Sequence, residues 1–352
     1  MGTVTSEQRI LAAFDRRIID RVPRYDIFLP GFITRWRQRN PAWAGRDIYD
    51  FYRSIDIGMV LPDQYGPYYA QRSILHDDGD SYVERDSWGR LLDMKRSGYF
   101  EHVREVPLKD KADLDRVPFG PPDQRGRFDQ LKAMADGKAG RFCLVAGVLG
   151  LFMSAYRLRG EEQLLMDIVD DPPFATELAH RLAGYAGEVG LRVTAETGTR
   201  HTPLWVYDEL ASRTGPLISP RSFERVFLEP YRSMIKAWRA AGIRHVVLHC
   251  DGNSLPLLPL LHEAGFDGLQ SLAPSARMDM SSVRTAWGDR FILIGGMCNV
   301  HTLPRGTLHE IETQARDAHA EALHGGVILG THSIDEDVPV ESYDHYCAAL
   351  DA

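Results

Sequence analysis

The chain has 352 residues, of which 44% are hydrophobic and 26% are charged, and its net charge is −8. This balance is typical of a soluble globular protein with a large core, and the acidic charge argues against nucleic acids and membrane surfaces as partners. No apolar run approaches the roughly 20 residues of a membrane-spanning helix, the N-terminus lacks the apolar core of a signal peptide, and the four cysteines form no Cys-x-x-Cys pair, so we expect a cytoplasmic protein.

The first third of the chain predicts a capped helix, two strands and an insertion. Thr5–Gln8 precedes regularly spaced apolar residues, which indicates a capped N-terminal helix. Tyr25–Phe28 and Ile57–Leu61 have the pattern of buried strands. Between about Gln71 and Val106, two alternating stretches flank Ser87–Gly89, so we predict a β-hairpin there. We interpret this segment as a lid or dimer arm inserted into a larger fold.

From Phe128 onward, strand and helix patterns alternate to the end of the chain. The strands predicted in this part are Phe142–Gly147, Leu204–Tyr207, Arg244–Leu248, Gly268–Leu272, Phe291–Ile294 and Val327–Leu329. Such alternation predicts parallel strands with helices outside, and a count close to eight favours an α/β fold of the closed (β/α)8 TIM-barrel type. We expect one domain over residues 1–352. Neither a Gly-x-Gly-x-x-Gly nor a Walker motif is present, so nucleotide binding has no support.

Four strands in the second half of the chain are followed by side chains that bind metals or move protons. These side chains are Asp208, Glu209, His249, Cys250, Asp251, Cys298 and His332. Because chemistry in parallel α/β folds gathers at the carboxyl ends of the strands, we predict one shared site. Imidazole, thiolate and carboxylate groups are all zinc ligands.

Five of these residues also have an alternative, structural role. Asp251 would suit a turn or a helix cap, and Asp208 and Glu209 would suit hydrogen bonds to a loop or a helix N-terminus. Cys298 is either a fourth ligand or a small buried residue, because unliganded cysteine is often buried. His332 has the alternative of capping the final turn.

Aromatic residues near the strand ends are candidates for a substrate pocket. Tyr65 lies in an early loop, Phe152 follows the Phe142–Gly147 strand, and Tyr207 ends the next one. Packing is the alternative role for Tyr65 and Phe152. His245 lies at the start of its strand, which is the bottom of a barrel, so we expect it to be structural.

Several segments together resemble the uroporphyrinogen decarboxylase superfamily, and within it the zinc-dependent, corrinoid-linked methyltransferases. The resemblance covers almost the whole chain and implies a distorted TIM barrel. The segments that carry it are Arg9–Phe14, Asp20–Pro23, Tyr207–Glu209, Gly215–Pro220, His249–Asn253, Gly295–Met297, and His332–Ile334 before Val338-Pro339.

The resemblance also points to a branch of the superfamily. The decarboxylase proper carries an arginine-rich segment after its first strand, whereas Tyr25–Phe32 has no such cluster. Coenzyme M methyltransferases of the family bind zinc through His-x-Cys and a later Cys; here His249 matches the histidine, Asp251 the first cysteine, and His332 falls at or next to the last. With Cys298 and Glu209 within reach, this more oxygen-rich set resembles the relatives that demethylate methoxylated compounds.

The residues and the resemblance leave three functions open. The first is a methyltransferase that moves a methyl group from a small, methoxylated aromatic substrate to a corrinoid, with one zinc per chain as Lewis acid and with Asp208 and Glu209 orienting or polarising the substrate. The chain has no Asp-x-His-x-x-Gly motif, so the corrinoid would sit on a separate protein. The second is a metal-independent decarboxylase or lyase that uses Asp208 or Asp251. The third, a non-catalytic binding protein, is disfavoured by the ionisable residues at the strand ends. The resemblance further implies a homodimer.

Overall fold

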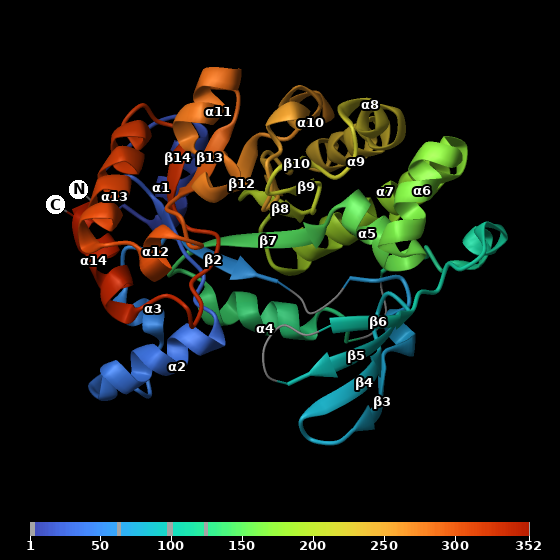
Figure 1. Cartoon of the computed structure of the whole chain (residues 1–352), viewed down its shortest axis with the longest axis horizontal. Helices are drawn as coiled ribbons and strands as arrows, with labels where there is room; N and C mark the ends of the chain where they lie inside the picture. Colours follow the sequence, from blue (N-terminus) through green and yellow to red (C-terminus); the bar gives the residue numbers. More distant parts are fainter. Residues whose placement is uncertain (1–3, 62–64, 97–100, 123–125, 352) are drawn as a thin grey trace.

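The structure is a computed structural model that describes residues 4–61, 65–96, 101–122 and 126–351. Eight parallel strands form one sheet in the order β1-β14-β13-β12-β11-β8-β7-β2, with helices around it (Figure 1). The strands are β1 Arg24–Tyr25, β2 Ile57–Val60, β7 Cys143–Leu149, β8 Leu204–Tyr207, β11 Val246–His249, β12 Gly268–Leu272, β13 Ile292–Gly296 and β14 Val327–Gly330. This arrangement confirms the predicted (β/α)8 barrel.

The helices follow the strands along the chain and cover the outside of the barrel (Figure 1). They are α1 Ser6–Phe14, α2 Pro30–Arg39, α3 Ile48–Phe51, α4 Asp129–Lys138, α5 Leu151–Arg159, α6 Glu161–Asp170, α7 Pro172–Glu196, α8 Pro220–Phe223, α9 Glu229–Ala240, α10 Leu258–Ala264, α11 Met280–Trp287, α12 Thr302–Arg305, α13 Leu308–Ala322 and α14 Val340–Asp351. Among the described residues, no helix combines the length and hydropathy needed to cross a bilayer.

Helix α1 closes the amino-terminal end of the barrel. Its residues Ile10 and Phe14 belong to the same buried cluster as the strand residues Val145 and Trp205. The ring of Phe14 lies 4.4 Å from that of His245, at the start of β11, as expected for a histidine at the bottom of a barrel. Because α1 covers the amino-terminal end, a functional site is expected at the carboxyl ends of the strands.

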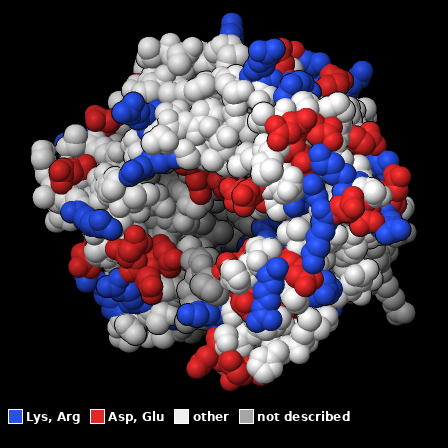
Figure 2. Space-filling model, turned by 45° about the vertical axis from the view of Figure 1, so that its right-hand side comes forward, with Lys and Arg blue, Asp and Glu red and all other residues white. Residues whose placement is uncertain are grey.

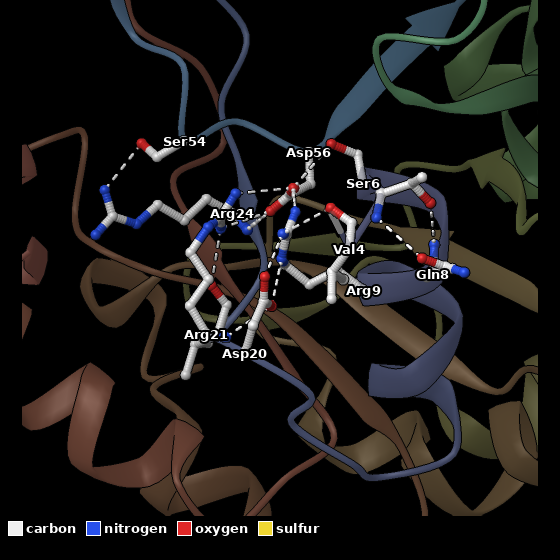
Figure 3. A network of polar contacts seen from close by, with 11 residues as sticks. Val4, Ser6, Gln8, Arg9, Asp20, Arg21, Arg24, Ser54 and Asp56 are labelled. Carbon is white, nitrogen blue, oxygen red and sulfur yellow. Dashed lines mark hydrogen bonds and ion pairs between the residues drawn. The ribbon is translucent and has the colours of Figure 1, made fainter. Parts of the chain in front are cut away.

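The barrel closes between β1 and β2 through Asp56, whose side chain is fully buried. Its backbone N–H donates to the carbonyl of Arg24 at 2.8 Å. Its carboxylate accepts hydrogen bonds from Arg9 at 2.6 Å, from Arg21 at 2.8 and 2.9 Å, and from the Arg24 N–H at 3.0 Å (Figure 3). Asp56, which directly precedes β2, thus links β2 at one edge of the sheet to β1 at the other edge and to helix α1.

The predicted insertion is a four-stranded antiparallel sheet, the insertion sheet, in the order β3-β4-β5-β6. Its strands are β3 Ser73–Asp77, β4 Ser81–Arg85, β5 Leu91–Lys95 and β6 Glu101–Glu105. The β4–β5 pair, with Ser81 opposite Lys95, confirms the predicted hairpin around Trp88. The two outer strands were not predicted, because every residue of β3 and β6 is exposed and shows no alternation of burial.

The structure differs from the prediction in two elements. The first strand ends at Tyr25, and Phe28 makes only an isolated bridge to Ile334. Helix α2 was missed because it has only two buried residues, too few for a recognisable apolar face.

We predict that Asp56→Ala destabilises the protein by about 3–5 kcal/mol, because it leaves two arginines without their buried partner. Chemical denaturation measures the free energy of unfolding. The matched control is Asp15→Ala, which removes a pair with Arg17 in which both side chains are more than 60% exposed and should leave stability nearly unchanged. Equal effects of the two substitutions would contradict the role given to Asp56.

Candidate metal and catalytic site

Three of the predicted ligands meet at the carboxyl ends of β11 and β14. His249 ends β11, Asp251 follows it, and His332 follows β14; each offers a ligand atom, and these atoms lie within 4.8 Å of one another. One carboxylate oxygen of Asp251 lies 3.5 Å from Nε2 of His249 and 3.3 Å from Nε2 of His332. We call these residues the triad.

Two of the three separations between ligand atoms in the triad fit a tetrahedral metal ion. Two ligands that are each about 2.0–2.1 Å from a tetrahedral zinc ion lie about 3.3 Å apart, which follows from the bond lengths and the tetrahedral angle. The two nitrogen–oxygen separations in the triad, 3.3 and 3.5 Å, match this value and exceed the usual length of a direct hydrogen bond. Two imidazoles and a carboxylate are also ligands that zinc accepts.

Gln270 orients the first ligand of the triad. This residue lies opposite His249 in the β11–β12 ladder, and its Oε1 is hydrogen-bonded to Nδ1 of His249. Because an amide oxygen only accepts, Nδ1 carries the hydrogen and the lone pair of Nε2 faces Asp251. Burial also lowers the pKa of His249 to about 4, so the ring is neutral at neutral pH.

Gln270 was not identified from the sequence, although a signal was present. It is a polar residue in the centre of a strand whose five residues are all buried. Buried polar side chains require partners, so this pattern indicates a contact with the site. His332 is oriented in a similar way, by a 3.1 Å contact between its Nδ1 and the hydroxyl of Ser333.

Glu209 lies beside the triad and is suited to proton transfer. Its Oε1 is 4.0 Å from Nε2 of His249, and its side chain is 34% exposed. Burial, followed by the charges of Asp251 and Asp208, raises the pKa of Glu209 to about 7. A carboxyl group with this pKa holds and releases a proton near neutral pH.

Asp208 makes hydrogen bonds to a helix N-terminus, which is the structural role that we gave as its alternative from the sequence. Its fully buried carboxylate accepts hydrogen bonds from the N–H groups of Phe152 at 3.1 Å and Met153 at 2.7 Å, and from the hydroxyl of Tyr231. A Cβ on Gly150 would come within 2.4 Å of this carboxyl group. Asp208 therefore fixes the start of α5 to the end of β8, and its oxygens are not free to bind substrate.

The structure does not bring either cysteine of the predicted site into the triad. The sulfur of Cys298 accepts a hydrogen bond from the N–H of His301 at 3.4 Å. Burial raises the pKa of Cys298, but hydrogen bonds from the following backbone outweigh this effect and lower it. Cys250 is buried in the hydrophobic core, and burial raises its pKa to about 12.

Of the predicted aromatic residues, Tyr207 contacts the triad. Its ring centroid is 4.7 Å from that of His249. Phe152 is fully buried and packs on Tyr156 and Phe227, which is the packing role given as its alternative. Tyr65 is 6% exposed and lies in the buried core.

A hollow opens on the face toward which the strands point. In Figure 1, the arrows of β2 and β7 run to the right, and Figure 2 turns this side forward. Acidic side chains gather along the edge of the hollow (Figure 2). A cationic group, such as a metal ion, is favoured electrostatically in such surroundings.

We predict that Asp208→Asn changes the pH dependence of stability. Burial raises the pKa of Asp208 from 3.8 to about 6, so between these values the folded protein holds a proton that the unfolded chain has lost. Stability therefore falls as pH rises through this window, by up to about 3 kcal/mol from this group. The variant loses hydrogen bonds and is less stable throughout, but its deficit should shrink from pH 4 to pH 7 in denaturation experiments. A deficit that is the same at both values would contradict the raised pKa.

Comparisons with known proteins agree with the fold. A search of curated proteins found no match. Among solved structures, a methyltransferase from Methanosarcina mazei matches with a TM-score of 0.72 and 18% sequence identity, over 99% of each chain; at this identity, the similarity concerns the fold. The family described as Uroporphyrinogen decarboxylase (URO-D) matches residues 80–352. The chain therefore belongs to the uroporphyrinogen decarboxylase family.

Proposed function

We propose that this protein is a zinc-dependent methyltransferase that moves a methyl group from a small, methoxylated aromatic substrate to a corrinoid carried by a separate protein. The observation that supports it most is the pair of distances, 3.3 and 3.5 Å, between one Asp251 oxygen and the two imidazoles. The solved structure that shares the fold is named a methyltransferase, which agrees with the reaction class.

His249, Asp251 and His332 would hold the ion. When bound there, zinc would supply a Lewis acid to the ether oxygen and so stabilise it as the methyl group leaves. Gln270 and Ser333 keep the two imidazoles turned so that both Nε2 atoms face the same point. Asp251 contributes the negative charge that a site of two neutral histidines would otherwise lack.

Glu209 would supply the proton that the leaving oxygen requires. Its pKa of about 7 allows it to be protonated in a large share of molecules at neutral pH. Its Oε1 lies on the same side as Nε2 of His249, 4.0 Å away. Asp208 would act as a positioning residue, because its carboxylate holds α5 against the end of β8, and the ring of Tyr207 would wall the site.

The same carboxyl group supports the alternative, a metal-independent decarboxylase or lyase of the family. A protonated Glu209 could deliver a proton to the carbon that loses carbon dioxide. This alternative gives no role to the convergence of His249 and His332 on Asp251, which is why we place it second.

We predict that the purified protein contains about one zinc per chain and that His249→Ala and His332→Ala each lose it, since a structural or catalytic zinc needs at least three protein ligands. Elemental analysis measures the metal. The matched control is His245→Ala at the other end of β11, which should retain zinc. Less than about a tenth of a zinc per chain in the wild type, after attempted reconstitution, would exclude the metal site.

The reaction itself is tested with reduced cobalamin as the methyl acceptor. We expect the zinc-loaded protein to form methylcobalamin and the free phenol from methoxylated aromatics, followed by absorbance and chromatography. His249→Ala should lower the rate at least about a hundredfold, because Lewis-acid stabilisation is worth several kcal/mol. Carbon dioxide release from carboxylated substrates, without methylcobalamin, would instead establish the decarboxylase.

A further inference from the structure

The two histidines of the triad are held in different ways. His249 lies within β11, between β8 and β12, and is paired in both ladders. His332 lies two residues beyond the end of β14, and the ladders that β14 makes with β13 and β1 both end at Gly330. The side chain of His332 is 32% exposed, compared with 8% for His249. The position of His332 therefore depends on the contacts of the loop that carries it.

Asp26 holds the first residue of this loop, Thr331–Ile334, which we call the ligand loop. Asp26 directly follows β1, and one oxygen of its carboxylate accepts hydrogen bonds from the N–H of Thr331 at 2.9 Å and from the Thr331 hydroxyl at 2.8 Å. Both residues are buried. Because the β1–β14 ladder stops at Tyr25, a side chain thus continues the link between the two strands as far as the residue before His332.

Asp26 is itself fixed by two tyrosines. The hydroxyl of Tyr343, on α14, donates to its second carboxylate oxygen at 2.8 Å, and the hydroxyl of Tyr49, on α3, donates to its backbone carbonyl at 3.4 Å. Burial raises the pKa of Asp26 to about 6, so at neutral pH the carboxyl group is largely ionised and only accepts hydrogen bonds. A buried carboxylate with three donors around it is a rigid anchor for the ligand loop.

Other contacts hold the part of the ligand loop that follows His332. The carbonyl of Ser333 accepts a hydrogen bond from Nδ2 of Asn299 at 3.0 Å, and the N–H of Ile334 donates to the carbonyl of Ile27 at 2.8 Å. Without the buried carboxylate, the loop would keep these contacts after the histidine and lose those at the residue before it. The imidazole would then no longer be fixed from both sides.

From these contacts we infer that Asp26 is a positioning residue, which fixes the ligand loop and thereby places Nε2 of His332 3.3 Å from Asp251. The inference rests on the proposed function for the role of His332 as a metal ligand. The contact between Asp26 and Thr331 does not depend on that function. Residues that orient metal ligands usually affect metal affinity 10- to 100-fold when they are replaced, although they do not touch the ion.

The zinc affinity of the purified protein at neutral pH, measured by competition with a chromophoric chelator, tests this inference. We expect Asp26→Ala to weaken zinc binding about 10- to 100-fold. Asp26→Asn keeps an oxygen that accepts from Thr331, so its affinity should lie within about threefold of the wild type. An equal loss in both variants would mean that the charge of Asp26 acts on the ion, and it would overturn a positioning role.

The matched control is Asp167→Ala. Asp167 is another buried carboxylate, on α6, and it binds Arg159 at 2.7 Å and Lys111 at 3.0 Å. Its removal should cost stability but leave zinc affinity as in the wild type, because neither partner belongs to the triad or to the ligand loop. If Asp26→Ala does not fold, Thr331→Val, which removes one of the two donors to Asp26, should weaken zinc binding about two- to tenfold.

Amide hydrogen exchange of the metal-free protein, followed by mass spectrometry, tests the same contact without zinc. Asp26→Ala should accelerate exchange in the ligand loop about tenfold but not in β11, because the Thr331 N–H loses its acceptor. Unchanged exchange, or wild-type zinc affinity in Asp26→Ala, would overturn the inference and leave the proposed function standing. Absence of zinc from the wild type would refute the proposed function, while the exchange rates would still decide whether Asp26 fixes the loop.

Discussion

The barrel depends on one buried carboxylate. Strand β1 has only two residues, and the sheet order ends with β1 and β2, so the ladder alone does not join its two edges. Asp56 makes the connection through its backbone and its carboxylate, and the arginines that bind it come from α1 and the loop after it. Because the barrel is closed in this way at the bottom, the carboxyl ends of all eight strands surround one mouth, where residues distant in sequence meet.

The two ends of the barrel use charge differently. At the bottom, arginines and aspartates hold permanent charges in direct pairs, which supports the closure. At the mouth, burial moves the pKa values of His249 to about 4 and of Glu209 to about 7. Burial disfavours the charged form of any group, so it keeps the histidine neutral and leaves the glutamate protonated in a large share of molecules near neutral pH. The same physical effect thus gives the two residues opposite proton affinities relative to their ordinary values.

The candidate site is built on barrel elements. The triad and Glu209 are on barrel strands and the loops that follow them, whereas the insertion forms a separate antiparallel sheet. Asp208 joins helix α5 to the barrel, because its carboxylate fixes the start of α5 to the end of β8.

Local patterns in the sequence determined the barrel and the β4–β5 hairpin, and they placed the residues of the triad among seven candidates at the strand ends. Hydrophobic periodicity is a property of neighbouring residues, and parallel strands necessarily bring their carboxyl ends together, so His249, Asp251 and His332 could be placed at one site without coordinates. Only the tertiary structure decided which way each side chain points. Cys298 accepts a hydrogen bond from the backbone of its own loop, Asp208 accepts hydrogen bonds from the start of α5, and Gln270 is hydrogen-bonded to His249. These outcomes depend on contacts between segments far apart in the chain, and hydrogen-bond partners of that kind leave no periodic trace in the sequence.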